Sequence, residues 1–387
     1  MQIAGRRFDT GQAVVLEVRD GSIIAEHPGE PRRDLPWLAP GFVDLQVNGY
    51  CGQEFNDPDL TVEKIERVCL AMDADGVTSF CPTSTTHSFA MQSSTMRRLA
   101  EACDRSPSVA RRVPGFHLEG PYISPIDGPR GAHPLEHCRP PDWDEFCRIQ
   151  EAAGGRIRIL TLSPEYEGSP RFIERAAESG VVVAIGHTNA SSDQIRDAIR
   201  AGARMSTHLG NGAHGQIRRH PNYIWDQLAA DELVASLIVD GHHLPPAVVK
   251  SFVRGKTPTR CVLVSDLVGM AGMPPGAYTN TSIGNIEILE GGRIVVAGQR
   301  QYLAGAGLPI TWGIANIMRF AQVDLCTAIK MATQWAASLI GTESQLRVGA
   351  AANLVLFDVP ETGPVHVRAT INHGELVAGA LSSVAVR

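Results

Sequence analysis

VVVAIGHT, residues 181–188, is an apolar run rich in β-branched residues that ends with a histidine and a threonine. Three other runs have a similar form: VPGFHLEG (113–120), ARMSTHLG (203–210) and CVLVSD (261–266). At or next to the end of each run is a side chain that can bind a metal or transfer a proton: Glu119, His187, His208 and Asp266. Residues so distant in sequence share a site when their strands lie side by side with their carboxyl ends at one face, as in a parallel barrel. The pattern therefore indicates a barrel with a metal-dependent hydrolase site at its mouth.

Strand-like and helix-like segments alternate around these runs. We expect eight strands, at residues 41–47, 77–81, 113–118, 157–162, 181–186, 203–207, 234–239 and 260–265. Helical periodicity is present at 61–75, 88–105, 142–153, 168–179, 191–200 and 246–253, and again, after a hairpin-like insertion at 279–303, at 309–321 and 325–340. Eight strand–helix units in about 300 residues are typical of an α/β protein with a closed (β/α)8 TIM barrel.

Both ends of the chain are β-like, and neither has enough apolar residues to form a core alone. AVVLEV and GSIIAE, joined by the turn signal Asp20-Gly21, lie near the N-terminus. ANLVLFDV, VHVRATINHG and ELVAG lie near the C-terminus. We expect the two ends to pair into one small β-sandwich domain, residues 1–40 and 346–387, beside a barrel domain of residues 41–345.

The composition is that of a globular chain with a large core. Of 387 residues, 43% are hydrophobic and 20% are charged, and the formal net charge is −6. This charge is spread along the chain, so we expect neither nucleic acid nor a membrane as a partner. The N-terminus does not have the pattern of a signal peptide, and no apolar run is long enough to span a bilayer. The eight cysteines form no CxxC pair, which argues against a cysteine–zinc site and favours a reducing, cytoplasmic location.

Three of the four strand-end residues have the chemistry of metal ligands. Glu119, His187 and His208 offer one carboxylate and two imidazoles. Catalytic zinc commonly takes three protein ligands and keeps a fourth position for water, which the cation acidifies. Asp266 is then placed to take a proton from the water and pass it to the leaving group. A single strand-end histidine is more often structural, but four such residues at four strand ends favour a shared catalytic site.

Eight motifs follow one another along nearly the whole chain. They are PGFVDLQVNGYCGQEFND (40–57), GFHLEGPYISP (115–125), GHTNAS (186–191), THLGN (207–211), IVDGHHL (238–244), LVSD (263–266), ATQWAASLIG (332–341) and VGAAANLVLFD (348–358). In this order they resemble the N-acetylglucosamine-6-phosphate deacetylase family of the amidohydrolase superfamily. The resemblance implies a metal-dependent enzyme that removes acetate from an N-acetylated amino sugar 6-phosphate, with N-acetyl-D-glucosamine 6-phosphate as the expected substrate.

The first strand bears on the number of metals. Many amidohydrolases end this strand with His-x-His, whereas this chain has Gln46 and Asn48. Amides are poor ligands for zinc beside imidazole and carboxylate. We therefore expect one divalent metal ion per subunit, with Zn2+ favoured and Fe2+, Co2+ or Mn2+ as alternatives.

The resemblance also implies residues that bind substrate. His133 is expected to reach the substrate carbonyl, where with the metal it would stabilise the oxyanion, or a sugar hydroxyl. The other positions are Asn211 and Gly212 for the sugar phosphate, His243 for the sugar, and Arg218 and Arg219 for the phosphate. In the family the phosphate-binding arginine, matched here by Arg219, usually comes from the partner subunit, which implies a homodimer with a shared phosphate site.

One segment departs from the family pattern and leaves alternatives open. HLGNGAHGQIRRHPNYIWDQ (208–227) has Gly210 where a bulky aromatic is usual and Gly212 where alanine is usual, and it carries an extra histidine, His214. These changes reshape the sugar pocket without touching the metal residues. Other open substrates are N-acetylgalactosamine 6-phosphate, a non-phosphorylated N-acetyl sugar, an N-acyl amino acid or a cyclic amide. A non-catalytic scaffold with the same fold is the alternative from another class.

Overall fold

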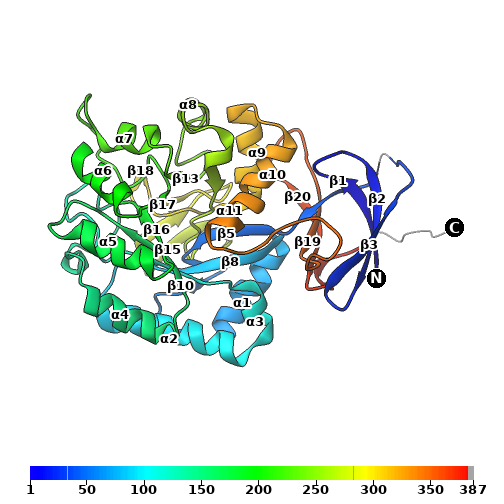
Figure 1. Ribbon diagram of the computed structural model, residues 1–387, viewed down its shortest axis with the longest axis horizontal. Helices are drawn as coiled ribbons and strands as arrows, with labels where there is room; N and C mark the ends of the chain where they lie inside the picture. Colours follow the sequence, from blue (N-terminus) through cyan, green and yellow to red (C-terminus); the bar gives the residue numbers. More distant parts are fainter. Residues whose placement is uncertain (33, 282, 382–387) are drawn as a thin grey trace.

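The computed structural model describes residues 1–32, 34–281 and 283–381, and its centre is a parallel eight-stranded sheet (Figure 1). The strand order is β14-β13-β12-β11-β10-β9-β8-β5. The strands are β5 (Phe42–Val47), β8 (Val77–Ser84), β9 (Phe116–Glu119), β10 (Ile157–Leu162), β11 (Val182–Ile185), β12 (Met205–Ser206), β13 (Val234–Leu237) and β14 (Cys261–Leu263). Each overlaps one of the eight expected strands, so the predicted barrel is confirmed.

Backbone hydrogen bonds close the barrel between its first and last strands. The Asp266 amide donates to the Gln46 carbonyl oxygen at 3.0 Å, and the Asn48 amide donates to the Leu267 carbonyl oxygen at 2.8 Å. This closure places the segment after β14 beside the end of β5, which brings the proposed proton carrier next to the two amide side chains of the first strand.

Helices surround the sheet, as expected for strands that are buried on both faces. They are α1 (Val62–Ala74), α2 (Phe89–Arg105), α3 (Pro107–Arg112), α4 (Trp143–Ala152), α5 (Ser169–Glu178), α6 (Ser192–Arg200), α7 (Tyr223–Ala229), α8 (Pro246–Lys256), α9 (Ile310–Ala321), α10 (Leu325–Met331) and α11 (Gln334–Leu339), with 3-10 turns at Leu135–His137 and Pro258–Arg260. In the described part of the chain, no helix is long and apolar enough to cross a membrane.

The helix predictions differ from the structure in three places. The expected helix at 325–340 is two helices, because the backbone of Thr333 leaves helical geometry with φ −139° and ψ −95°. The short helices α3 and α7 were not expected, since six or seven residues show little periodicity. A capping signal for α7 is nevertheless in the sequence, where the Asn222 side chain accepts from two backbone amides of its first turn.

The two ends of the chain share a seven-stranded sheet at one end of the molecule, where Figure 1 draws blue and red strands side by side. Its order is β21-β20-β19-β4-β1-β2-β3. The strands are β1 (Gln2–Arg7), β2 (Ala13–Arg19), β3 (Ser22–Pro28), β4 (Trp37–Pro40), β19 (Leu354–Asp358), β20 (His366–Asn372) and β21 (Glu375–Gly379). The expected pairing of the termini is present in a single hydrogen-bonded sheet. Residues 33 and 382–387 of the predicted small domain lie outside the described residues, and the boundaries at 40 and 346 stay predictions.

An antiparallel sheet follows the last barrel strand and includes the predicted insertion. Its strands are β15 (Gly276–Thr281), β16 (Gly284–Ile288), β17 (Ile294–Val296) and β18 (Gln299–Leu303), in sequential order. A short hairpin of β6 (Gly49–Tyr50) and β7 (Gln53–Glu54) follows β5. Both lie after the carboxyl ends of barrel strands, the face on which barrel enzymes carry their sites.

Candidate metal-dependent active site

Three of the four strand-end residues have an unusual backbone conformation. His187, His208 and Asp266 follow β11, β12 and β14, and their φ angles are 48°, 28° and 56°. Non-glycine residues rarely adopt positive φ, and each costs about 1–3 kcal/mol. Such strain persists where the surrounding structure fixes it, and it concentrates at functional sites. Here the positive φ angles direct the three side chains at the strand ends toward one another.

The predicted metal ligands meet in a buried cluster. Glu119 Oε1 lies 3.0 Å from His208 Nε2 and 3.2 Å from His187 Nε2, and the two imidazole nitrogens are 3.1 Å apart. The relative exposures of these side chains are only 3–6%. The structure thus brings together the three residues that the sequence singled out.

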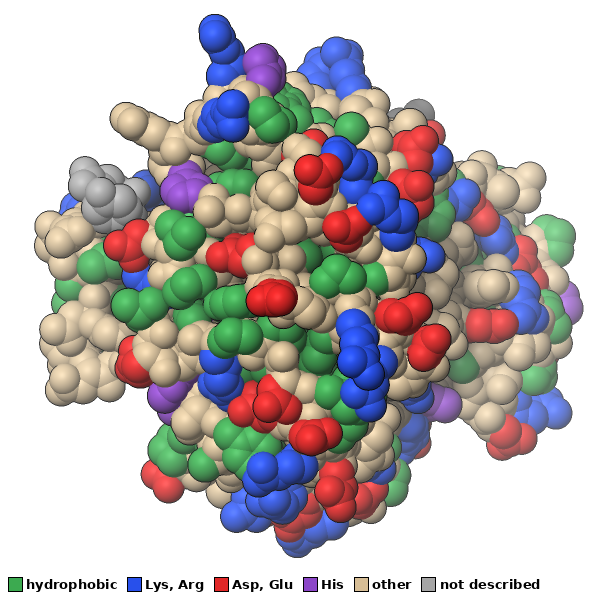
Figure 2. Space-filling model, turned by 60° about the vertical axis from the view of Figure 1, so that its left-hand side comes forward, with side chains coloured by type: hydrophobic (Ala, Val, Ile, Leu, Met, Phe, Trp, Pro, Cys, Tyr) green, Lys and Arg blue, Asp and Glu red, His purple; other side chains and the backbone are tan. Residues whose placement is uncertain are grey.

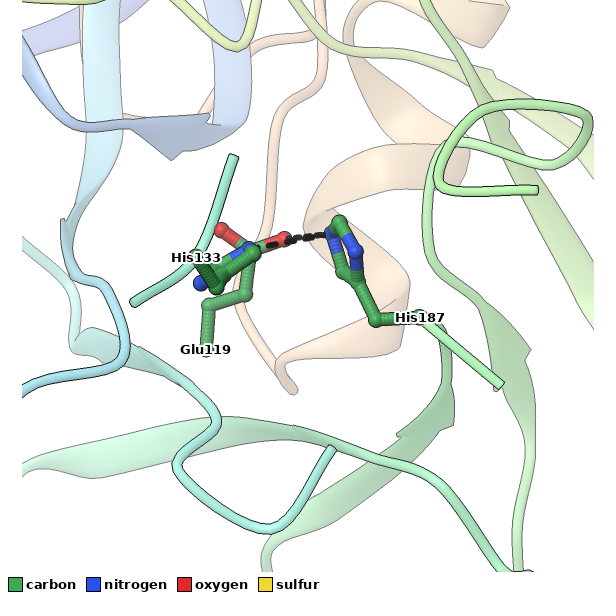
Figure 3. Close-up of side chains that lie close together, drawn as sticks. All are labelled: Glu119, His133 and His187. Carbon is green, nitrogen blue, oxygen red and sulfur yellow. Dashed lines mark hydrogen bonds and ion pairs between the residues drawn. The ribbon is translucent and has the colours of Figure 1, made fainter. Parts of the chain in front are cut away.

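His133 joins this cluster from the loop after β9 (Figure 3). Its Nε2 is 3.2 Å from Nε2 of His187, and potential ligand atoms of Glu119, His133 and His187 all lie within 4.8 Å of one another. Burial lowers the pKa of His133 to about 3, so the ring is neutral. The sequence placed His133 near the substrate and gave no reason to count it among the ligand-capable groups.

The tautomer of His187 supports a cation at this point. Its Nδ1 lies 2.9 Å from the Pro129 carbonyl oxygen, which can only accept, so Nδ1 carries a proton. In the neutral ring Nε2 therefore presents a lone pair, and this lone pair faces a carboxylate oxygen and two imidazoles. A divalent cation fits this donor set because it satisfies lone pairs that otherwise oppose one another. Carbonyl contacts of this kind orient histidine ligands in metalloproteins.

The charge balance of the cluster is consistent with ligands that hold a cation. Burial alone would raise the pKa of Glu119, but its interactions with His187 and His208 outweigh burial and hold the pKa well below its usual value. Burial alone would lower the pKa of His208, but contact with Glu119 raises it. Nδ1 of His208 is buried and has no hydrogen-bond partner among the described residues.

Asp266 lies beside the cluster with a pKa suited to proton transfer. Burial, together with the charge of Glu119, raises its pKa to about 6, close to the range where a group can both accept and donate a proton. Asn48 Nδ2 donates to Asp266 Oδ1 at 2.8 Å and favours the ionised form.

The side-chain amides of Gln46 and Asn48 each donate a hydrogen bond to a carboxylate. Gln46 Nε2 donates to Glu119 Oε1 at 3.0 Å, and Asn48 Nδ2 donates to Asp266 Oδ1. The side-chain amide oxygens, Gln46 Oε1 and Asn48 Oδ1, are buried without a partner in the described part of the chain.

The residues predicted to bind substrate divide into two groups, those close to the buried cluster and the two exposed arginines. Asn211 and Gly212 lie against the cluster: Asn211 Nδ2 donates to the His208 carbonyl oxygen at 3.2 Å, and a Cβ at Gly212 would lie 2.6 Å from His187 Nδ1. His243 lies in the loop between β13 and α8. Its Nδ1 contacts Asp240 Oδ2 at 2.8 Å.

Arg218 and Arg219 are exposed on the segment before α7. Asn222 Nδ2 donates to their carbonyl oxygens at 2.9 and 3.2 Å, which fixes the backbone and leaves the guanidinium groups outward. Figure 2 shows basic and histidine side chains projecting at the top of the molecule, the end where Figure 1 places α7. Among the described residues, no hydrogen bond or ion pair joins either arginine to the buried cluster.

Two supporting residues were missed by sequence reasoning. Asp44, in the middle of β5, accepts from the backbone amides of Ser265 at 3.1 Å and Gln46 at 3.3 Å, and burial raises its pKa to about 7. Glu165 accepts from Ser124 Oγ at 3.0 Å and from the Asn189 amide at 2.7 Å, which ties together the loops after β9 and β11. For Asp44 the sequence did contain a signal, because an acidic residue within an apolar strand run is unusual.

Comparison with known proteins places this site in a family. The amidohydrolase family profile matches residues 37–383. The chain belongs to the amidohydrolase family. It is therefore a hydrolase of carbon–nitrogen bonds, in a family whose members use a divalent metal, and its Glu119–His133–His187 group can hold one.

Relatives of this amidohydrolase deacetylate amino sugar phosphates, as the resemblance implied. It is 31% identical to the N-acetylgalactosamine-6-phosphate deacetylase of Escherichia coli O157:H7 over 94% of both chains. It is 32% identical to the N-acetylglucosamine-6-phosphate deacetylase of Bos taurus, covering 88% of this chain and 83% of that protein. The structure of a mutant N-acetyl-D-glucosamine-6-phosphate deacetylase of Mycobacterium smegmatis, in complex with N-acetyl-D-glucosamine-6-phosphate, matches with a TM-score of 0.86 at 27% identity, and the match covers 97% of this chain and 99% of that chain.

Proposed function

We propose that this amidohydrolase removes acetate from N-acetyl-D-glucosamine 6-phosphate to give glucosamine 6-phosphate. The observation that carries the proposal is the buried meeting of Glu119, His187 and His208, with Asp266 beside it. Similarity to several named deacetylases of this sugar phosphate supports the choice of substrate. Since the ligand set and Asp266 are all present, the non-catalytic scaffold is disfavoured.

Each residue has a defined task in the proposed reaction. Glu119, His187 and His208 would hold one divalent metal, with Zn2+ favoured by the imidazole and carboxylate donors and Fe2+, Co2+ or Mn2+ as alternatives. When bound, the metal acidifies a water molecule and polarises the acetamide carbonyl. Asp266 takes the proton of the attacking water and delivers it to the amide nitrogen as the carbon–nitrogen bond breaks, which yields acetate and the free amine. His133 is positioned to contact the carbonyl oxygen as negative charge develops there.

A panel of sugars tests the substrate. Acetate release is measured with N-acetylglucosamine, N-acetylgalactosamine and N-acetylmannosamine, each with and without the 6-phosphate. We expect the highest kcat/KM with N-acetylglucosamine 6-phosphate and a large loss when the phosphate is absent. Equal rates with and without phosphate would contradict the proposed substrate class. A preference for N-acetylgalactosamine 6-phosphate is the second candidate, favoured by the Escherichia coli relative that spans 94% of this chain.

We also propose a homodimer in which Arg219, supported by Arg218, binds the phosphate in the site of the partner subunit. The exposed guanidinium groups on a fixed backbone support this role. A mixture of Arg219→Ala and Asp266→Asn subunits tests it, because a mixed dimer then contains one complete site. Activity should reappear on mixing, and no recovery despite subunit exchange would contradict a shared site. Arg171→Ala, an exposed arginine on α5, is the control. Residence in the cytoplasm stays a prediction.

A further inference from the structure

Asp240 and His243 form a buried carboxylate–imidazole pair in the loop that follows β13. Asp240 Oδ2 lies 2.8 Å from His243 Nδ1, and the two side chains are only 4% and 11% exposed. The loop follows the carboxyl end of a barrel strand, so the pair lies on the face where barrel enzymes carry their sites. The proposed reaction gives the carboxylate of Asp240 no task.

The two oxygens of Asp240 have separate partners. Oδ1 accepts from the backbone amides of His242 at 2.8 Å and His243 at 2.9 Å, while Oδ2 faces the ring of His243. Aspartate commonly stabilises a turn by accepting from backbone amides that follow it in the chain. Since Oδ1 alone performs this local role, the contact of Oδ2 with the imidazole is a second and distinct one.

The backbone around the pair is fixed on both sides of the turn. Gly241 has a φ of 86°, a left-handed conformation that glycine adopts at little cost. Before the turn, Asn316 Nδ2 of α9 donates to the Val239 carbonyl oxygen at 2.9 Å, and a Cβ at Gly241 would lie 3.4 Å from the same nitrogen. The carboxylate and the imidazole are therefore held together before any substrate binds.

The proton between the two groups belongs to Nδ1 of His243. Burial alone would raise the pKa of Asp240, but its interactions with His243 and with the two backbone amides outweigh burial and lower the pKa to about 2. An ionised carboxylate can only accept, so Nδ1 donates to it. In the neutral ring Nε2 then carries a lone pair, and among the described residues no hydrogen-bond partner is found for this nitrogen.

We propose that Asp240 is a positioning residue that keeps the proton of His243 on Nδ1, so that Nε2 accepts a hydrogen bond from a hydroxyl group of the bound sugar. Carboxylates fix the tautomer and orientation of histidines in other active sites in the same way. A hydroxyl group suits the lone pair of Nε2 because it can donate, whereas an ionised phosphate or a carbonyl oxygen can only accept. This inference rests on the sugar substrate of the proposed function and not on its epimer or its phosphate.

Asp240→Asn tests the position of the proton with little change in shape. The asparagine Oδ1 can still accept from the backbone amides, but its Nδ2 places a donor against His243 Nδ1. The proton of His243 should therefore move to Nε2. Long-range proton–nitrogen NMR spectra of the zinc-loaded enzyme, isotope-labelled in its histidines, distinguish the two tautomers at mildly alkaline pH, where an unperturbed histidine is neutral. His243→Ala assigns the signals by their loss.

Kinetics then test whether Asp240 acts through His243. With N-acetylglucosamine 6-phosphate, Asp240→Asn should lower kcat/KM by about 2–10-fold, the effect of one hydrogen bond. In a His243→Ala background the same substitution should have no further effect. Asp324→Asn is the control, because Asp324 also accepts from a backbone amide, that of Thr327 at 2.7 Å, but at the start of α10. It should leave the spectra and kcat/KM unchanged.

Three results would overturn the inference. They are a wild-type His243 protonated on Nε2, the same proton position in wild type and Asp240→Asn, and an equal loss of kcat/KM from Asp240→Asn with and without His243. If the asparagine variant does not fold, the wild-type spectrum and Asp240→Glu, which keeps a carboxylate and should keep Nδ1 protonated, decide the outcome. The spectra of the free enzyme do not depend on turnover, so failure of the proposed function is seen separately as an absence of acetate release.

Discussion

Replacement of Asn48 by alanine should move the acid limb of the activity profile to higher pH. Asn48 Nδ2 donates to Asp266 Oδ1 at 2.8 Å, and Asp266 is buried with a pKa raised to about 6. A hydrogen bond to a charged group contributes about 1.5–3 kcal/mol, and one pKa unit corresponds to about 1.4 kcal/mol. Loss of the bond should therefore raise the pKa of Asp266 by about 1–2 units.

The sign follows from the role of Asp266 as a base. The carboxylate form is the active one, so kcat/KM falls as pH decreases through the pKa. A higher pKa means that activity is lost at a higher pH, and we expect the acid limb of Asn48→Ala to lie about 1–2 pH units above that of wild type. At alkaline pH, Asp266 is ionised in both wild type and Asn48→Ala, so the two rates should converge.

The assay is acetate release at low substrate concentration between about pH 4.5 and 9. Asn56→Ala is the matched control, because Asn56 lies just after the β6–β7 hairpin and donates to Thr85 Oγ1 at 2.7 Å rather than to Asp266. Its acid limb should coincide with that of wild type. If Asn48→Ala lowers activity equally at every pH, Asp266 is not the group that limits activity in acid, and the reasoning is refuted.

Three further predictions test the base, the ligands and the fold. Asp266→Asn should keep its metal, measured by elemental analysis, while kcat falls by about 10²–10⁴-fold; near-wild-type turnover would contradict its role. Gly212→Ala should weaken metal binding by about 10–100-fold, measured by chelator competition, since the new Cβ would lie 2.6 Å from His187 Nδ1 at a φ of 55°; unchanged affinity would show that the loop adjusts. Arg112→Ala should destabilise the protein by about 3–5 kcal/mol in urea unfolding, because it leaves Asp73, which is 0% exposed and 2.8 Å from Arg112, without its ion pair; a loss below about 1 kcal/mol would indicate that Asp73 is protonated or solvated.

The barrel could be predicted because its strands are continuous apolar runs with clear ends. Short elements could not be predicted: α7 has seven residues, and its formation depends on the Asn222 cap and on packing as much as on periodicity. The break at Thr333 was missed for a similar reason, since residues 325–340 have one helical pattern although the backbone interrupts it.

The candidate site, too, could be predicted from the sequence only in part. Glu119, His187, His208 and Asp266 were recognisable because parallel strands present their carboxyl ends at one face. The contact of His133 with His187 was not, because a loop's path depends on its neighbours, such as the bond from Arg130 to the His133 carbonyl. The supporting roles of Asp44 and Glu165 depend on bonds to residues distant in sequence, which no local pattern records.

The sequence by itself determined the order of the barrel strands and of the longer helices, the pairing of the chain ends and the chemical types gathered at the barrel mouth. These follow from local hydrophobic periodicity and from the few ways in which parallel strands can close. The tertiary structure alone decided which atoms meet: the tautomer of His187 set by the Pro129 carbonyl, the raised pKa of Asp266, and the position of His133 beside the ligands. Hydrogen bonding and burial depend on separations of tenths of an ångström between distant segments, and only the folded chain fixes those separations.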